Sequence, residues 1–278
     1  MSVAGFGLAS AASWGGSDFL GGLGTRRAPA QLVVISGQLV SLLVLVAMIV
    51  ATGQGLPRDP ALGFAVVGGF EGALSLMLFY RALAMGAMGL TAAVAGLLTA
   101  LLPVVYALLR EGLPGPSVLA GLGLGLAAIW LITRTPAGAG ERTPARALLL
   151  GAVAGCGFGA QMILFKLASG CSFLWIVTSA RAAGSCAMLL ALLIAPPKVQ
   201  SWRGFWRFGI AAGLLDSVGT IFYIRATQLG RLDIAALLCS LYPAVTILLA
   251  AFVLRERPHP RQIAGMALAL AAVLLLSL

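Results

Sequence analysis

The chain has 278 residues, of which 60% are hydrophobic and only 9% are charged, and its formal net charge at pH 7 is +10. Soluble domains carry roughly 25% charged residues, so this composition excludes a water-soluble protein and predicts one that lies in a lipid bilayer. The basic residues fall singly or in small groups between long apolar runs. Lipid headgroups and membrane topology therefore explain the net charge better than nucleic acid does, and no nucleic-acid partner is expected.

Ten apolar runs follow one another along the chain, each near the length of about 20 residues that crosses a bilayer. Their predicted ranges are 3–24, 32–51, 61–83, 88–109, 117–133, 147–168, 174–195, 206–227, 232–253 and 261–277. No basic residue precedes the first run, so we expect a retained span rather than a cleaved signal peptide. The predicted fold is all-α, a polytopic membrane protein of ten transmembrane helices.

The two halves of the chain resemble each other at a constant offset of 144 residues. The matched pairs include Gly7 with Gly151, Gly15 with Gly159, Arg81 with Arg225, Gly86 with Gly230, and Pro116 with Pro260. Five spans in each copy place the second copy in the opposite orientation, as in the inverted repeats of secondary transporters. We therefore predict a first five-helix repeat over 1–134, a polar linker over 135–146 and a second repeat over 147–278. Such a pair of repeats predicts alternating access.

The basic residues in the connections are distributed unevenly between the two sides of the predicted bundle. Connections after odd-numbered spans hold twelve, namely Arg26, Arg27, Arg81, Arg134, Arg142, Arg146, Lys198, Arg203, Arg207, Arg255, Arg257 and Arg261. Connections after even-numbered spans hold five, namely Arg58, Arg110, Lys166, Arg225 and Arg231. The positive-inside rule then places both termini outside the cytoplasm.

Three acidic residues lie within predicted spans, where a charge is expensive. Asp18 lies beside the small and polar face of the first span, Glu71 in the middle of the third and Asp216 in the middle of the eighth. A charge at the centre of a span costs roughly 2.5–3.5 kcal/mol on insertion scales, so such residues usually face a bundle interior or water. We expect Glu71 and Asp216 to serve a cavity, as binding sites for an ammonium group or a coupling proton. The competing interpretation is a static ion pair with Arg181.

Arg181 lies about a third of the way into the seventh span. Its guanidinium can bind a carboxylate or phosphate of the substrate, neutralise Asp216, or extend to the membrane surface. Two prolines, Pro103 and Pro243, lie inside the fourth and ninth spans and predict either a structural kink or a kink that serves as a gate. The complete set of candidate substrate-binding residues is Trp14, Ser17, Glu71, Tyr80, Thr99, Phe158, Gln161, Arg181, Asp216, Tyr223, Ser240 and Tyr242.

Several short segments resemble EamA-type transporters of the drug/metabolite transporter superfamily. They are Ser13-Trp14-Gly15-Gly16-Ser17-Asp18-Phe19, Phe79-Tyr80-Arg81-Ala82-Leu83, Leu109-Arg110-Glu111, Ser240-Leu241-Tyr242-Pro243-Ala244-Val245-Thr246 and Leu254-Arg255-Glu256-Arg257. The resemblance implies ten spans in two repeats, and a secondary transporter, often an exporter of amino acids or other small metabolites, in a bacterial inner membrane. It also implies cytoplasmic termini, which opposes the charge count. Gly37 stands in the second span where Arg181 stands in the seventh, so an arginine that the family commonly has near this position is present only in the second half.

We therefore expect a multi-pass transporter, not an enzyme, that moves small organic solutes by alternating access, most readily amino acids outward. The expected partners are a small-molecule substrate and the lipid bilayer, with the chain as a monomer or homodimer. No cofactor or metal is expected, since the one histidine is His259 and no phosphate-binding lysine motif is present. The alternatives are a nucleotide-sugar or sugar-phosphate exchanger that uses Lys166, Arg181 and Arg225, then a passive channel or a membrane-embedded enzyme acting on a lipid-linked substrate.

Overall fold

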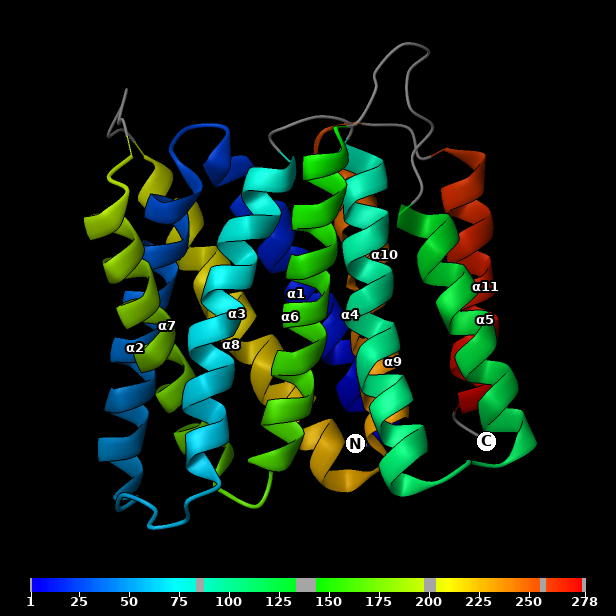
Figure 1. Cartoon of the computed structure of the whole chain (residues 1–278), viewed down its shortest axis with the longest axis horizontal. Helices are drawn as coiled ribbons and strands as arrows, with labels where there is room; N and C mark the ends of the chain where they lie inside the picture. The colour runs from blue at the N-terminus through cyan, green and yellow to red at the C-terminus, as the bar shows by residue number, and fades with distance from the viewer. Residues whose placement is uncertain (1, 84–87, 134–143, 198–203, 256–258, 277–278) are drawn as a thin grey trace.

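The computed structural model of the chain describes residues 2–83, 88–133, 144–197, 204–255 and 259–276 (Figure 1). Within these ranges every regular element is an α-helix. The helices are α1 (Val3–Thr25), α2 (Ala30–Thr52), α3 (Leu62–Leu83), α4 (Met88–Glu111), α5 (Pro116–Thr133), α6 (Ala145–Leu167), α7 (Phe173–Ile194), α8 (Phe205–Leu229), α9 (Leu232–Cys239), α10 (Tyr242–Val253) and α11 (Pro260–Leu276). The predicted linker lies mostly outside the described residues.

In the part of the chain that the structure describes, seven segments are long and apolar enough to cross a membrane, six of them within single helices and the seventh formed by α9 and α10 together. The helices α5 and α11 are apolar but shorter. Helix α1 has 23 residues, yet its serines, glycines and Asp18 lower its apolar character. Ser10, Gly16 and Ser17 face α8. Gly7 and Gly15 face α9 and α10, so the polarity belongs to the interior of the bundle.

The predicted ends of the helices agree with the structure to within two residues, except in the ninth span. There the chain forms two helices, α9 and α10, with a break at Ser240 and Leu241. Pro243 lies in the first turn of α10, where its missing N–H leaves no helical hydrogen bond unmade. Pro103, by contrast, lies inside α4, which continues to Glu111. The two prolines therefore have different local consequences.

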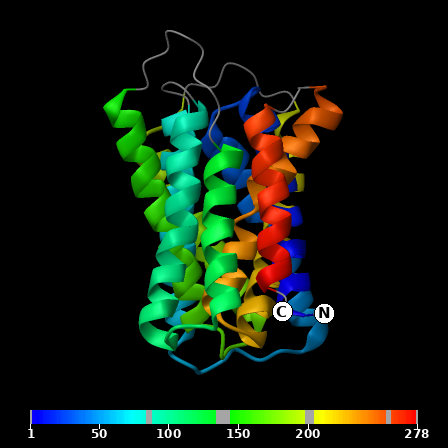
Figure 2. The ribbon, with the colours of Figure 1, turned by 90° about the vertical axis from the view of Figure 1, so that its right-hand side faces the viewer.

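The helices form a bundle with both ends of the chain on the same side (Figures 1 and 2). We call this side the termini end. Helix α1 starts at the termini end, whereas α6 starts at the opposite end. The connections α2–α3, α4–α5, α6–α7 and α8–α9 lie at the termini end.

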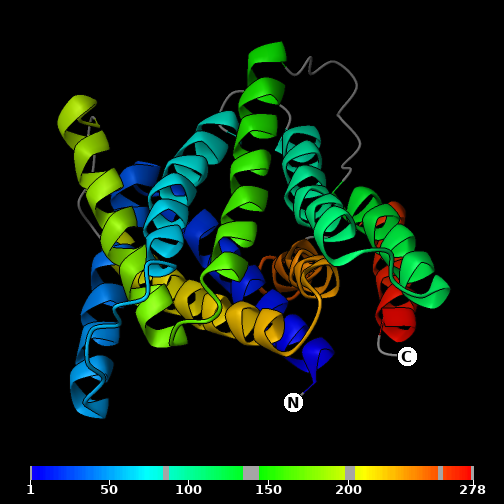
Figure 3. The same cartoon turned by 60° about the horizontal axis from the view of Figure 1, so that its bottom comes forward.

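The most extensive packing joins helices from different halves of the chain. Helix α1 packs along α8, α3 along α6, and α5 along α11 (Figure 3). Glycines allow this close approach: the backbones of α2 and α8 touch at Gly37 and Gly213, and Gly69 of α3 lies against the backbone of Ala180 in α7. Small residues let membrane helices gain van der Waals contact at short range. The two halves therefore share one interior.

Candidate functional site

A cavity lies at mid-height in the bundle, between helices of both halves. It encloses about 860 Å³ of empty space, including the part that is open to the outside. Side chains from α1, α2, α3, α4, α6, α7, α8 and α10 line it. The sequence predicts the first, third, fourth, sixth, eighth and ninth spans as lining elements. The structure adds α2, through Gln38, and Ala180 of α7 beside the predicted Arg181.

An ion pair between a buried arginine and a partly exposed aspartate forms the polar wall of this cavity. Nη2 of Arg181 binds Oδ2 of Asp216, joining α7 to α8. Arg181 also donates from Nη1 to Oε1 of Gln38 at 3.3 Å and from Nη2 to Oγ1 of Thr220 at 3.3 Å. Its Nε is buried and has no hydrogen-bond acceptor. Of the interpretations left open for Arg181, the structure shows the pairing with Asp216.

Aromatic side chains form apolar walls of the same cavity. Trp14 donates from Nε1 to the carbonyl of Asp216 at 3.3 Å, which fixes the indole beside the ion pair. Phe79 and Phe158 meet edge to face with ring centroids 6.0 Å apart, and Tyr242 lines the wall contributed by α10. Such a combination of a charged wall and aromatic walls suits an organic solute with a polar end and an apolar body.

A second, smaller cavity of about 450 Å³ lies beside the first. The two have five lining residues in common: Asp18, Gln38, Leu76, Arg181 and Asp216. The ion pair and Asp18 therefore lie where the two cavities adjoin.

Eight of the predicted binding residues lie at these cavities. Trp14, Thr99, Phe158, Gln161, Arg181, Asp216 and Tyr242 line the larger one. Ser17 lines the smaller one, where its hydroxyl donates to the carbonyl of Ala212 at 2.8 Å. Gln161 donates from Nε2 to the carbonyl of Gly68 at 2.8 Å, which ties α6 to α3.

Three other predicted binding residues have different surroundings. Glu71 lies between α3 and α6, where Oε2 accepts from Ser75 at 3.3 Å and Oε1 is buried without a donor. Tyr223 is fully buried and donates to the carbonyl of Met162 at 2.7 Å. Ser240 is buried at the break between α9 and α10. None of the three is among the described residues that line either cavity, and the side chain of Tyr80 lies outside the described residues.

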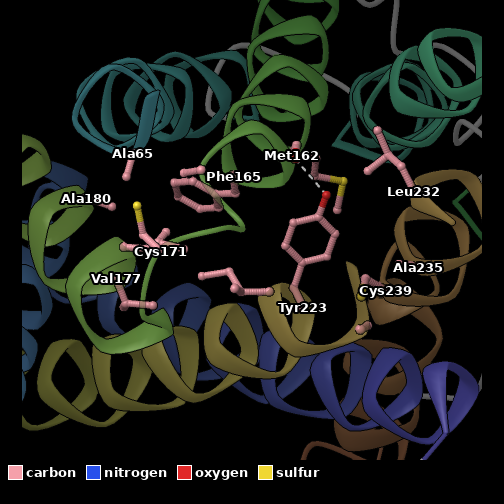
Figure 4. Close-up of a cluster of buried hydrophobic side chains, with 14 of the residues drawn as sticks. Ala65, Met162, Phe165, Cys171, Val177, Ala180, Tyr223, Leu232, Ala235 and Cys239 are labelled. Carbon is pink, nitrogen blue, oxygen red and sulfur yellow. Dashed lines mark hydrogen bonds between the residues drawn. The ribbon is translucent and has the colours of Figure 1, made fainter. Parts of the chain in front are cut away.

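A dense hydrophobic cluster separates the larger cavity from the termini end (Figure 4). Met162 and Phe165 belong both to the cavity wall and to this cluster. Behind them lie Tyr223, Leu232 and Cys239, each fully buried. Because the phenol of Tyr223 is held by the carbonyl of Met162, it crosses from α8 to α6 within the cluster. The cavity is therefore closed on this side by packed side chains.

A polar network lies beyond the cluster, at the termini end itself. Nζ of Lys166 donates to the carbonyl of Thr227 at 2.7 Å and to that of Gly230 at 3.1 Å, and lies 4.0 Å from Oε1 of Glu111. Arg231 donates to the carbonyls of Glu111 and Gly112. We call Glu111, Lys166, Arg231 and Asp233 the end network; it joins α4, α6, α8 and α9.

Asp233 anchors the arginine of the end network. Its side chain is fully buried and accepts from Nε and Nη2 of Arg231, with the closest contact at 2.9 Å. This hydrogen bonding, followed by charge attraction from the same group, raises the pKa of the Arg231 guanidinium above its ordinary value. The guanidinium of Arg231 therefore keeps its positive charge at physiological pH.

Sequence reasoning missed Gln38 and did not include Asp18 among the binding residues. Gln38 is a polar residue in an otherwise apolar run, and this was the available signal, since an amide in a span requires a partner. The remaining additions at the larger cavity are Gly69, Gly72, Ala73, Leu76, Phe79, Met162, Phe165, Ala180 and Thr220. Most of them are small or apolar residues, whose type does not distinguish cavity from packed interior.

The sequence model of the EamA-like transporter family matches residues 145–278. These residues form an EamA-like transporter domain. The match, which covers just under half of the chain, confirms the resemblance for these residues, and together with the apolar spans it supports a multi-pass membrane protein. No curated protein matches this chain.

The whole chain also resembles a solved structure described as "Crystal structure of protein". The two agree with a TM-score of 0.82 at 18% sequence identity, over 98% of this chain and 94% of the other. At this identity the likeness shows a common fold, and the fold extends across the first half as well as the EamA-like half.

Proposed function

We propose that the chain is a ten-span secondary transporter that exports small organic metabolites, with amino acids as the first candidates, by alternating access. The observation that carries this proposal is the cavity at mid-height, which is lined from both halves and contains the Arg181–Asp216 ion pair. Carriers bind their solutes near the bilayer midplane, at the interface between inverted repeats.

The pairing of helices supports an inverted repeat of five spans. If each helix is exchanged for its counterpart in the other half, the pair α1 and α8 becomes α6 and α3, and both pairs are packed along their length. Likewise α2 with α8 becomes α7 with α3, and both pairs are in contact. The opposite directions of α1 and α6 agree with this relation. Under the proposal, α9 and α10 form one broken ninth span.

The chemistry of the cavity favours amino acids over phosphorylated solutes. Lys166 is engaged in the end network, and Arg225 is exposed and bound to Gln228 at 3.1 Å. Of the basic residues that the structure describes, Arg181 alone lines the cavities, and it is paired with Asp216. A single guanidinium that is already paired suits a solute with one carboxylate better than a diphosphate, which prefers several cations. The aromatic walls then contact the side chain of the solute.

Efflux from proteoliposomes loaded with mixed amino acids and small metabolites tests the function. We expect selective and saturable loss of a few compounds, competed by an excess of the same compounds, as measured by mass spectrometry of the vesicle contents. Uniform loss without counterflow would show a channel instead. Retention of every compound, with and without a pH gradient, would contradict the proposed transport of metabolites.

Replacing Lys166 by methionine is expected to loosen the termini end. The variant removes two hydrogen bonds from a charged donor, each worth about 1.5–3 kcal/mol, while the methionine retains most of the apolar stem. The measurement uses a background in which Cys239, which is fully buried, is the one remaining cysteine. We expect the Lys166 variant to accelerate the labelling of Cys239 by N-ethylmaleimide by about tenfold or more. Arg225→Met removes an exposed cation from α8 and serves as the control. Equal labelling rates in the Lys166 variant and the parent chain would exclude a closing role for the end network.

A further inference from the structure

Asp18 is the acid at the cavities whose charge the structure leaves without a described partner. It lines both cavities from α1, together with Arg181 and Asp216. The guanidinium of Arg181 binds Asp216, Gln38 and Thr220, and Asp18 is not among its partners. When all three groups are ionised, the charges of Arg181 and Asp216 cancel, and one negative charge remains at Asp18.

Of the two other acids predicted within spans, one is paired with an arginine and the other lies away from the cavities. Asp216 is bound by Arg181, and Glu71 lies between α3 and α6 with Ser75 as its hydrogen-bond donor. Glu71 is not among the lining residues of either cavity. Asp216 also lines both cavities, but its charge is offset by Arg181. Of the acids within described spans, Asp18 is therefore the one that combines access to the cavity with a charge that no described cation offsets.

We propose that Asp18 binds the protonated amine of the transported solute and makes the cavity selective for solutes that carry a positive charge. This inference rests on the proposed transport function and assigns the recognition group within it. An ammonium group placed at Asp18 offsets the residual negative charge and donates charge-assisted hydrogen bonds to the carboxylate.

The neighbouring side chains favour such a ligand. Trp14 lies one helical turn before Asp18 on α1 and also lines the larger cavity, as does Tyr242. Aromatic faces attract cations, most strongly when the contact is desolvated. Asp18 and the guanidinium of Arg181 line the same cavity, so a solute with an amine at one end and a carboxylate at the other can meet both, and its amine is the part that Asp18 recognises.

The test compares matched solutes with and without a charged amine. Vesicles carrying the full-length protein are loaded with a set of amino acids and amines together with the N-acetylated form of each. We expect the wild-type chain to release the amines about tenfold or more faster than their acetylated forms, because a hydrogen bond between charged groups is lost on acetylation. Asp18→Asn is expected to remove this preference.

Two further variants keep the test independent of folding. Asp18→Glu retains the carboxylate and is expected to retain the preference for amines. Asp59→Asn changes an exposed acid in the α2–α3 connection, whose side chain accepts from the N–H of Ala61, and is expected to match the wild-type chain. Elution of each variant as a single symmetric species in detergent shows that it has folded.

The outcomes separate this inference from the function on which it rests. Saturable release of amines and acetylated forms at equal rates by the wild-type chain would overturn the role of Asp18 while leaving a transporter. An Asp18→Asn chain that still prefers amines in counterflow, and loses only transport driven by a pH gradient, would also overturn it by assigning a proton to Asp18. Absence of release of every compound would overturn both proposals.

Discussion

Arg181→Met is expected to destabilise the protein by about 1–3 kcal/mol, the largest electrostatic effect at the site. The substitution leaves the carboxylate of Asp216 without its partner, and removal of one member of a buried pair costs about 3–5 kcal/mol. We place the effect below that range because 36% of the Asp216 side chain is exposed and can be solvated from the cavity, whereas Arg181 is 10% exposed. Unfolding of the purified protein in detergent micelles, followed by circular dichroism, measures the change.

The double variant Arg181→Met with Asp216→Leu provides the decisive comparison. Replacing both members of a buried ion pair by apolar residues is often neutral or stabilising, so we expect stability to return close to that of the wild-type chain. Transport by the double variant should nevertheless be abolished, since the polar wall of the cavity is gone. Arg225→Met, which removes an exposed arginine, is expected to change stability by less than about 0.5 kcal/mol. If the double variant were as unstable as Arg181→Met, the loss would reflect packing of the arginine stem rather than an unpaired charge.

Gly69→Ala is expected to destabilise the bundle by about 1–3 kcal/mol, although it adds only one methyl group. A Cβ atom at this position would collide with the backbone of Ala180 in α7, which cannot move aside as a flexible side chain does. Ala180 immediately precedes Arg181, so the displacement of α7 should also disturb the ion pair. The expected result is a lower unfolding temperature together with reduced transport.

Gly63→Ala on the same helix supplies the matched control, for which we expect no loss of stability. No heavy atom lies within 4 Å of a Cβ at this position, so the alanine meets open space. Alanine favours a helix over glycine by up to about 1 kcal/mol, and we expect unchanged or slightly higher stability. Equal destabilisation by the two substitutions would show that α3 does not approach α7 as closely as the structure indicates.

Hydropathy predicts the helices well because crossing a bilayer imposes a length and an apolar character that each segment displays by itself. The exception is the break at Ser240 and Leu241. Both residues occur within a continuous apolar run, and Pro243 signals a disturbance there without showing whether the helix bends or restarts. Pro103 gives the same signal in α4, where the helix is uninterrupted. The difference arises from tertiary surroundings, which a local pattern does not contain.

The candidate site was predictable where charge forced the outcome. An arginine and an acid within membrane spans require partners, which predicts a pairing between Arg181 and Asp216 as one interpretation. The faces of the individual helices were less predictable. Tyr223 and Tyr242 are both aromatic residues near polar positions, yet Tyr223 is packed in the hydrophobic cluster and Tyr242 lines the cavity. Only the relative rotation of α8 and α10 decides between these surroundings.

The packing of α1 along α8 and of α3 along α6 has a mechanical consequence. Hydrogen bonds from Ser10 and Ser17 to α8, and from Gln161 to α3, bind each of these pairs across the two halves of the chain. Helices that are distant in sequence are therefore fastened to each other more firmly than many sequence neighbours. The natural rigid units are these mixed pairs, so a rearrangement that exposes the cavity to the termini end would slide one mixed pair past the other instead of swinging one half of the polypeptide about its connector.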